Sequence, residues 1–388
     1  MLPFVRMLEY GNTIPVLDVK KIEPYHNTGF IALDKNGKLY AKGSQQYGQF
    51  GTGNTTPLTK PTLIATDVSN FWAGIMTVII QKNDGTFWVS GANVSYYGLS
   101  VTSTNVFIEC TTQLEPGFSG AQEIYMVGGG NLILSFKTSG ELYCLGWDNQ
   151  GHSGIAIGVY NTWTKNTSSL INDIKKIQIG IQQVFALKND GTLIAWGANS
   201  NYMISNYISD SKFTVPVVVA VGGGITYDFH IMPGGALFVT DNGLWGKGYL
   251  NVLNQAGTFT TPTDIGIRIP LPFTMSTDIR FVKDLSTIQS STTQKVFMIS
   301  TDDKIYASGL EYNKCFGINS TASSGNIPLL TEVVNTYDGG VSSMYLTAQD
   351  NTLFVKGNDI YIAGNIAKYN GISTDNMVPI FTKTILTL

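Results

Sequence analysis

One pattern recurs seven times along this chain of 388 residues and constrains its fold more than any other feature. In each copy an apolar run leads into a short polar turn, a second apolar run follows, and in every copy that run ends at a glycine. The turn residues recur at intervals of 48 to 60 residues and are Gly37, Gly85, Gly140, Gly191, Gly243, Asp303 and Asn351. The closing glycines are Gly43, Gly91, Gly146, Gly197, Gly248, Gly309 and Gly357. A unit of this length cannot bury its own apolar face, so the copies are predicted to pack against one another.

The turns predict β-hairpins. Asn-Gly and Asp-Gly between apolar runs are the strongest short-range hairpin signal. Four copies carry one of them, at Asn36-Gly37, Asp84-Gly85, Asp190-Gly191 and Asn242-Gly243. Adjacent positions after the turn are both apolar, as in Phe87-Trp88. Because adjacent strand positions face opposite sides of a sheet, both faces are predicted to be covered.

Further segments complete each copy as four strands. A Val/Ile run precedes the hairpin at Val68, Val127 and Ile177–Ile179. Several copies continue with a proline, which fits an outer edge strand because proline cannot donate to a sheet ladder. These prolines are Pro61, Pro216, Pro328 and Pro379. We therefore predict an all-β fold, a seven-bladed β-propeller of four-stranded antiparallel blades, formed as a single domain by residues 1–388.

Closure of the ring is predicted from the two ends of the chain. Residues 18–22 supply a strand before the first hairpin, and residues 379–388 supply one after the last hairpin. We expect the two termini to share the closing blade.

The loops after the closing glycines carry a family resemblance. Residues 43–51 read GSQQYGQFG; the third copy keeps Gly146, Asn149, Gly151 and Gly154, and the sixth keeps Gly309, Phe316 and Gly317. In these positions the chain resembles the regulator-of-chromosome-condensation repeat family, as a diverged bacterial or phage-type member. The resemblance implies a seven-bladed propeller, and the family's best-known role is nucleotide exchange on a small nuclear GTPase together with chromatin binding. Kelch propellers are the alternative, but here the Gly-Gly pairs precede the first hairpin strand.

Composition limits the partners. Only 13% of residues are charged, against roughly 25% in typical soluble domains, and the net charge is −3. The 24 lysines and arginines are scattered, with Lys20-Lys21 and Lys175-Lys176 as the two adjacent pairs. Binding a phosphate backbone needs clustered cations, so direct nucleic-acid binding is not expected. No apolar stretch of about 18 residues occurs, so membrane insertion is not expected either.

The sequence offers little for catalysis. No metalloprotease, Walker or nucleophile-elbow motif occurs, so we expect no enzyme activity, no cofactor and no metal site. His152 lacks a partner residue at a supporting spacing, and the turn aspartates are explained by backbone hydrogen bonding. Three cysteines, Cys110, Cys144 and Cys315, fit folding in a reducing cytoplasm, with Cys144 expected to be a buried thiol.

Aromatic residues follow each closing glycine. Equivalent positions on successive blades lie on one face of a propeller, so we predict a partner-binding ring of rigid aromatic side chains there. Its members are Tyr47, Tyr96, Tyr97, Trp147, Tyr202, Tyr249, Tyr312 and Tyr361. The alternative is that these rings wedge between neighbouring blades.

Three functions remain open. The first is a non-enzymatic binding or structural propeller, such as a phage tail sheath, fibre or receptor-binding protein, because a neutral Asn/Thr-rich surface is typical of virion fibres and adhesins. It would contact a protein partner or host-surface receptor, and a homo-oligomer or larger assembly is open. The second is a regulator of nucleotide exchange on a small GTPase or a host-directed effector, and the third a carbohydrate-binding propeller. We expect a virion or extracellular location, with the cytoplasm as the alternative.

The scattered cations give a first prediction. Few counterions would be released on contact with DNA, so binding to duplex DNA at near-physiological salt should be weaker than micromolar. A fluorescence-anisotropy titration measures it, and sub-micromolar affinity would contradict the prediction.

Overall fold

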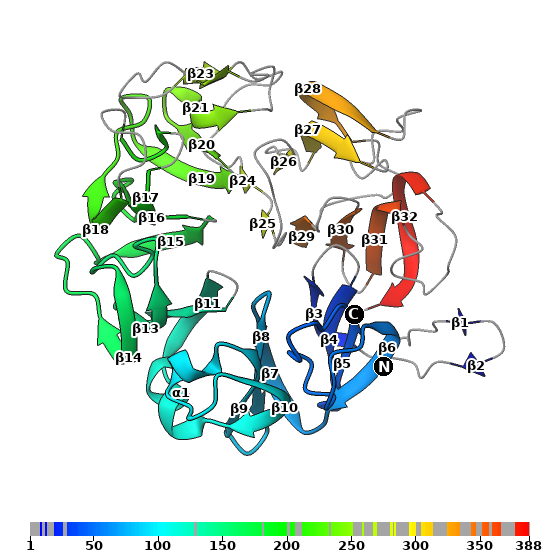
Figure 1. Ribbon diagram of the computed structural model, residues 1–388. Helices are drawn as coiled ribbons and strands as arrows, with labels where there is room; N and C mark the ends of the chain where they lie inside the picture. Colours follow the sequence, from blue (N-terminus) through cyan, green and yellow to red (C-terminus); the bar gives the residue numbers. More distant parts are fainter. Residues whose placement is uncertain are drawn as a thin grey trace.

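A computed structural model describes most of the chain. Its described residues are 8–9, 12–13, 19–25, 29–127, 130–180, 182–199, 202–205, 212–232, 234–250, 258–259, 267–269, 280–281, 283–284, 295–299, 304–312, 324–333, 343–346, 351–356, 359–365 and 377–387. Seven sheets of four or five strands lie side by side in a ring (Figure 1), which confirms the all-β propeller. Five of these sheets have four strands and two have five.

The sheets are numbered as blades in chain order, and each strand is given from the inside of the ring outward. Blade 1 contains β3 (Val19–Tyr25), β4 (Gly29–Asp34), β5 (Leu39–Gly43) and β6 (Leu58–Ala65). Blade 2 contains β7 (Val68–Ala73), β8 (Thr77–Lys82), β9 (Phe87–Ala92) and β10 (Ser103–Glu109). Blade 3 contains β11 (Ala121–Val127), β12 (Leu132–Lys137), β13 (Leu142–Asp148) and β14 (Gly158–Lys165). Blade 4 contains β15 (Ile174–Ile179), β16 (Gln183–Lys188), β17 (Leu193–Ala198) and β18 (Lys212–Val218).

The later blades are less uniform. Blade 5 contains β19 (Thr226–Met232), β20 (Gly235–Thr240), β21 (Gly243–Leu250), β22 (Thr258–Phe259) and β23 (Ile267–Ile269). Blade 6 contains β24 (Arg280–Phe281), β26 (Lys295–Ile299), β27 (Ile305–Tyr312) and β28 (Ser324–Glu332). Blade 7 contains β25 (Lys283–Asp284), β29 (Ser343–Leu346), β30 (Asn351–Lys356), β31 (Asp359–Asn365) and β32 (Met377–Thr387). A two-stranded hairpin, β1 (Leu8–Glu9) with β2 (Asn12–Thr13), precedes blade 1.

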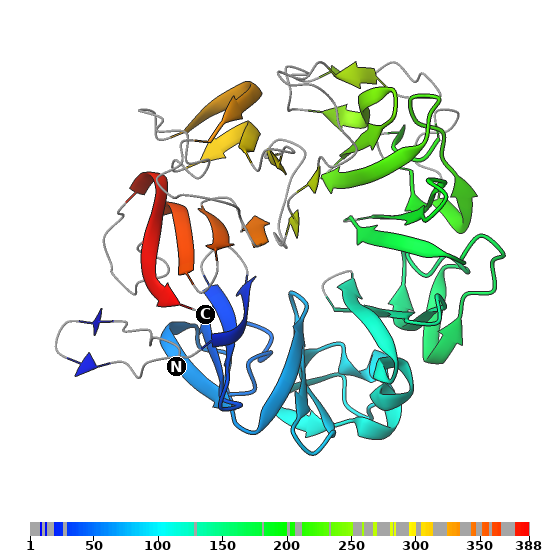
Figure 2. The same ribbon diagram turned by 180° about the vertical axis from the view of Figure 1, so that it is seen from behind.

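The two ends of the chain lie in different sheets. Strand β3 begins a complete four-stranded blade 1, whereas β32 is the outer strand of blade 7. The predicted sharing of one closing blade by the termini is therefore wrong, because β3 pairs with β4 of blade 1 whereas β32 pairs with β31 of blade 7. Figures 1 and 2 show blades 1 and 7 as neighbours in the ring.

The closing glycines shape the end of the third strand. In blade 3, Gly146 has φ +113°, and the next amide, of Trp147, donates to the carbonyl oxygen of Asn131 at 2.8 Å. A Cβ on Gly146 would lie 2.2 Å from that oxygen. Gly91 and Gly197 repeat this geometry, with Cβ distances of 2.1 and 2.4 Å to the equivalent carbonyl oxygens. Glycine is needed here both for its positive φ and for the close approach of two backbones.

The outer strands bulge next to these glycines. In blade 3, Cys144 pairs with Thr164 and Gly146 with Tyr160, so residues 161–163 lie opposite a single residue. Blades 1, 2, 4 and 6 have a register shift at the same place. The predicted outer-strand prolines lie in β6, β18, β28 and β32, as expected. Bulges and prolines both prevent an edge strand from pairing with another chain.

The hydrophobic core lies between adjacent blades. Between blades 4 and 5, for example, Phe185 packs on Phe229 and Phe238 with ring centroids 6.2 and 5.9 Å apart. The two lysine pairs seen in the sequence reinforce equivalent junctions. Lys21 Nζ donates to the Phe71 carbonyl oxygen at 2.6 Å, and Lys176 Nζ donates to that of Phe229 at 2.7 Å. Both lysines thus join an inner strand to the next blade.

A short helix, α1 (Thr111–Phe118), lies between blades 2 and 3 and was not indicated by the sequence pattern. Lys137 of β12 holds its C-terminal end, because Nζ donates to the carbonyl oxygens of Pro116, Gly117 and Ser119 at 3.0, 2.6 and 2.5 Å. Burial lowers the pKa of Lys137. Cations at a helix C-terminus satisfy its unpaired carbonyls.

The closing glycine yields a prediction with a matched control. Gly140, in the hairpin turn of the same blade, has φ +84°, but a Cβ added there would meet no atom within 4 Å, whereas a Cβ on Gly146 would overlap the Asn131 backbone. Gly140→Ala should destabilise by about 1–2 kcal/mol through φ alone. Gly146→Ala should cost at least ~3 kcal/mol, because strain and backbone overlap add. Urea unfolding of both variants measures the difference, and equal losses would contradict the role given to the close approach.

Candidate functional site

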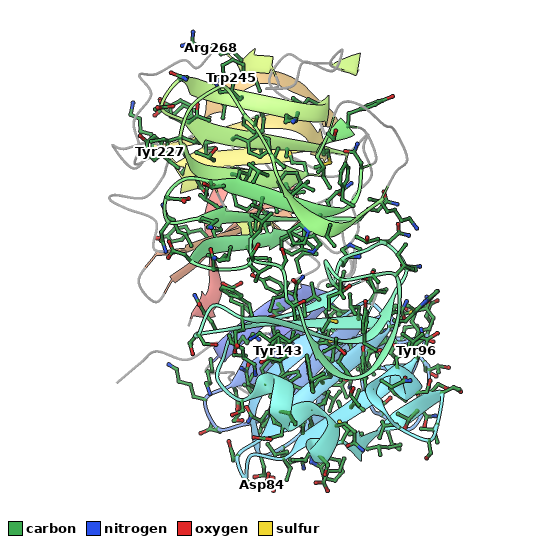
Figure 3. The ribbon with its side chains drawn as sticks, turned by 90° about the vertical axis from the view of Figure 1, so that its left-hand side faces the viewer. Asp84, Tyr96, Tyr143, Tyr227, Trp245 and Arg268 are labelled. Atoms are coloured by element: carbon green, nitrogen blue, oxygen red, sulfur yellow. The ribbon has the colours of Figure 1, made fainter. Side chains whose placement is uncertain are left out.

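The ring has two different faces. We call the side of the hairpin turns the turn face, and the side of the segments that follow the closing glycines the loop face. Figure 3 shows Asp84, Tyr227, Trp245 and Arg268 along one edge of the molecule and Tyr96 toward the opposite edge. The predicted aromatic ring belongs to the loop face.

The structure revises where the predicted aromatic residues lie. Tyr47 and Tyr202 lie in loops, and Tyr96 and Tyr97 lie in a 3-10 turn, η1 (Val94–Tyr97). The other four lie in strands, so their predicted loop position is wrong: Trp147 in β13, Tyr249 in β21, Tyr312 in β27 and Tyr361 in β31. The reason is that β13, β21 and β27 extend past the closing glycine. In blade 7 a new antiparallel strand, β31, begins two residues after that glycine. The side chains of Tyr249 and Tyr312 lie outside the described part.

Tyr97 is a blade wedge. Its side chain is fully buried, with 0% exposure, among Ile133, Leu145 and Phe118 at the junction of blades 2 and 3. Burial raises the pKa of its hydroxyl. A partner cannot reach this ring, so the predicted contact role is wrong for Tyr97 and the wedge alternative holds there.

Tyr96 and Trp147 are brought together from neighbouring blades. Their ring centroids are 5.8 Å apart with planes inclined by 36°. Both rings are half-buried, as are Tyr47, Tyr202 and Tyr361. These residues therefore keep surface available to a partner while also packing on the propeller.

Sequence reasoning missed the residues that shape the loops. Asp148, buried two positions after Gly146, accepts backbone N–H bonds from Gln150, Gly151 and His152 on Oδ1 at 2.8–3.1 Å and from Ser153 on Oδ2 at 2.7 Å. Asn199 of blade 4 accepts from Ile204 and Ser205 in the same way, at 2.9 and 3.0 Å. The signal was present, because an amide or carboxylate follows six of the seven closing glycines by two residues. These are Gln45, Asn93, Asp148, Asn199, Glu311 and Asp359.

Two of the loops are fastened to the next blade by a side-chain hydrogen bond. Ser90 Oγ of blade 2 donates to the Gly48 carbonyl oxygen of the first loop at 2.8 Å. Trp196 Nε1 of blade 4 donates to the His152 carbonyl oxygen of the third loop at 2.7 Å. The loop face is therefore fixed by the same contacts that hold the blades together.

His152 does have a carboxylate neighbour, contrary to the expectation from spacing. Its Nδ1 lies 3.9 Å from Asp148 Oδ1. However, His152 is 2% exposed, and the Asp148 carboxylate already accepts four backbone N–H bonds. The pair is enclosed in the protein, where a substrate has no access.

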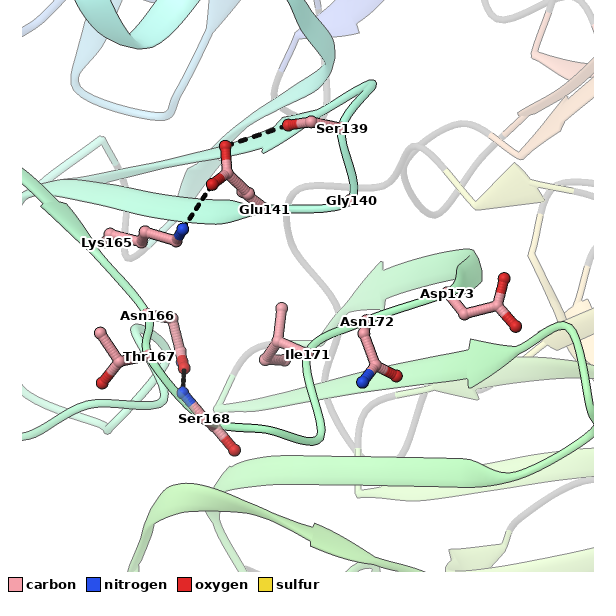
Figure 4. A pocket seen from close by; sticks show the side chains of 10 residues that line it. All are labelled: Ser139, Gly140, Glu141, Lys165, Asn166, Thr167, Ser168, Ile171, Asn172 and Asp173. Carbon is pink, nitrogen blue, oxygen red and sulfur yellow. Dashed lines mark hydrogen bonds and ion pairs between the residues drawn. The ribbon is translucent and has the colours of Figure 1, made fainter.

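A shallow hollow of about 370 Å³ lies between blades 3 and 4 near their turns (Figure 4). Its lining residues are Ser139, Gly140, Glu141, Lys165, Asn166, Thr167, Ser168, Ile171, Asn172 and Asp173. Glu141 accepts from Ser139 Oγ at 3.0 Å and pairs with Lys165, and these bonds lower the pKa of Glu141. Glu141 and Lys165 thus neutralise each other, while the Asp173 carboxylate accepts from the Asn189 amide, and the arrangement resembles an ordinary polar surface.

Other chemistry is limited in the part of the chain that the structure covers. Burial raises the pKa of the Cys110 and Cys144 thiols to about 12, so neither is a ready nucleophile, and the buried position expected for Cys144 is confirmed. Cys315 lies outside this part. No cluster of three metal-binding side chains occurs among the residues described. In the same residues, no helix has the length and apolarity needed to cross a bilayer.

The repeated strands, glycines and fastened loops define a seven-bladed β-propeller. No family model matches the sequence. A curated RCC1 repeat-containing protein of Dictyostelium discoideum is 24% identical over 215 residues, which cover 50% of this chain and 43% of that protein. The chain thus spans less than half the length of that relative.

Two solved structures share the fold. Human WBSCR16 superposes with a TM-score of 0.62 at 14% identity, over 87% of this chain and 86% of that one. Saccharomyces cerevisiae Prp20p superposes with a TM-score of 0.59 at 15% identity, over 85% and 80%, and its structure was described with its binding to Gsp1p and histones. These likenesses show that the chain has an RCC1-like β-propeller fold.

The junction of blades 4 and 5 predicts a pH dependence. His230 of β19 is buried, and burial together with the nearby Lys176 ammonium lowers its pKa from 6.5 to about 3. The folded state holds this imidazole neutral. Its contribution is therefore complete above pH 6.5 and is lost as the pH falls from 6.5 toward 3, by about 2 kcal/mol at pH 5.

His230→Gln removes the titration and should reduce the stability difference between pH 7 and pH 5 by that amount. Urea unfolding of both proteins at the two pH values provides the measurement. An identical pH dependence in the variant would show that His230 has the same pKa in the folded and the unfolded protein.

Proposed function

We propose that this propeller is a non-enzymatic module that binds a protein partner through its loop face. The observation that carries the proposal is the composition of that face. Residues 44–57, 93–102, 149–157 and 199–205, which follow the closing glycines of blades 1 to 4, contain no lysine, arginine, aspartate or glutamate. Half-buried Tyr47, Tyr96 and Tyr202 lie in these segments. Interface centres are depleted of charge and enriched in aromatic residues.

The turn face has the opposite character. The hairpin turns at residues 34–38, 82–86, 137–141 and 188–192 each carry charged residues. Lysine, aspartate and glutamate are depleted from interface centres, and exposed charged turns hold water strongly. The contrast favours the loop face as the partner surface, and the fixed loop geometry favours binding because little ordering is needed.

A photo-crosslinking amino acid tests the proposal. It would replace Tyr47 or Tyr202 on the loop face, with Asp84 or Asp190 on the turn face as matched controls. We expect discrete adducts from the loop positions after incubation with extract of the source organism, with the captured protein then shown to bind as a purified pair. Adducts from the turn positions alone would overturn the proposal.

Nucleotide exchange on a small GTPase is a second candidate. The likeness to Prp20p, whose structure was described with its binding to Gsp1p, favours it. A catalytic amount of the propeller should then accelerate release of a fluorescent GDP analogue from Gsp1p. An unchanged release rate would exclude exchange on that GTPase.

More specific roles and a location are proposed from the amino-acid composition. A virion role, as tail sheath, fibre or receptor-binding protein, rests on the 13% charged content, and none of the similar proteins named above is a virion protein. A virion or extracellular location, the cytoplasmic alternative, assembly into oligomers and the expected lack of nucleic-acid binding are proposed on the same basis.

A further inference from the structure

One pair of aromatic rings on the loop face differs from the rest. Tyr96 of η1 and Trp147 of β13 come from adjacent blades, and both are half-buried, whereas the neighbouring Tyr97 is fully buried. Val159 lies directly opposite Trp147 in the β13–β14 register and is 49% exposed. Opposed residues of an antiparallel pair project from the same side of the sheet. The three side chains therefore form an apolar strip that runs from blade 2 to the outer strand of blade 3.

The polar tips of the two rings are available. Trp147 Nε1 and Tyr96 Oη have no hydrogen bond to any described residue, and neither atom is enclosed. Three other indoles donate a hydrogen bond, those of Trp88, Trp163 and Trp196, whereas Trp245 Nε1 is buried without a described partner and Trp72 Nε1 also has none among the described residues. Trp88 Nε1 donates to Thr86 Oγ1 at 2.9 Å, and Trp163 Nε1 donates to the Gln113 carbonyl oxygen at 2.8 Å. An indole N–H can only donate, so Trp147 presents a free donor at the edge of an apolar strip.

The residues beside the strip include an amide pair and two charged side chains that are hydrogen-bonded. Asn93 Nδ2 donates to Asn131 Oδ1 at 2.7 Å beside η1. The carboxylate of Asp148, adjacent to Trp147, is buried and bound to four backbone amides of its own loop. Lys212 Nζ is held by the Asn149 carbonyl oxygen at 2.7 Å. A cationic ligand would therefore lose hydration without gaining a free counter-charge, whereas an anionic ligand would meet the exposed ammonium of Lys212, which already donates to Asn149.

We propose that this strip docks an extended, proline-containing segment of the protein partner. The proposal rests on the proposed function and specifies the partner's chemistry. A polyproline II segment has no internal hydrogen bonds, so its carbonyl oxygens are free acceptors, and its prolines lack N–H groups. Acceptors and apolar rings complement a free indole donor beside two aromatic rings, the recognition mode of aromatic-lined grooves. Sugar hydroxyls can also accept from the indole N–H, so a disaccharide is the competing ligand in the test.

Nuclear magnetic resonance of the indole groups tests this proposal. The full chain, labelled with ¹⁵N at its six tryptophans, would be titrated with decaproline, and Trp147→Phe would assign the Trp147 signal. We expect a saturable shift of that signal. Trp147→Phe keeps an aromatic ring but loses the donor, so it should weaken decaproline binding about five- to tenfold, as for loss of one hydrogen bond. Trp88→Phe, whose indole is bonded at the turn face, is the matched control and should bind as the wild type does.

The outcomes separate this inference from the broader function. No shift of the Trp147 signal, equal affinity in Trp147→Phe, or a shift caused by cellobiose instead of decaproline would each overturn the docking proposal. The loop-face crosslinks are measured independently. If they hold while decaproline fails, protein binding stands and the chemistry assigned to the partner is wrong. Circular dichroism of each variant confirms that loss of binding does not reflect unfolding.

Discussion

The close approach of two backbones at each closing glycine is the constraint on which the other features depend. At Gly91, Gly146 and Gly197 a side chain would overlap a carbonyl oxygen of the second strand. Glycine allows the third strand to remain paired at this point while its next amide continues to bond the same oxygen. The chain then forms the loop that leads to the outer strand of the same blade. In blades 2, 3 and 4 this local geometry sets where the loop begins.

On the loop face, residues that stabilise the blade junctions lie next to residues that we propose to contact a partner. Ser90 and Trp196 fasten loops of the preceding blade, and Tyr97 fills the junction of blades 2 and 3. Tyr96, one residue earlier, remains half-exposed beside Trp147. Tyr97 thus fixes the junction of blades 2 and 3, and this rigid junction holds the exposed ring of Tyr96 in one orientation. Preorganisation of this kind lowers the cost of binding.

Much of the fold could be predicted because its determinants are local. The hairpins follow from Asn-Gly and Asp-Gly turns, and the outer strands from Pro61, Pro216, Pro328 and Pro379, each of which acts within a few residues. Helix α1 was missed because Lys137, which lies 18 to 21 residues from the carbonyls it binds, holds its end. The burial of Tyr97 and the exposure of Tyr96 were not predictable, because identical neighbours in sequence are distinguished by blade packing alone. The extra strand β31, which contains Tyr361, likewise depends on pairing with β32.

The ring is closed without exchange of a strand between its ends. Blade 1 and blade 7 are each complete, and they meet as two finished surfaces. Consecutive blades inside the chain are joined by a covalent connection, whereas blades 7 and 1 lie side by side without one. At the junction of blades 7 and 1, the ring thus forms without a covalent link between the two blades. The blade at which the chain begins is therefore not fixed by the arrangement of blades in the ring. A circular permutation that begins at another blade junction keeps every strand pairing of the present molecule.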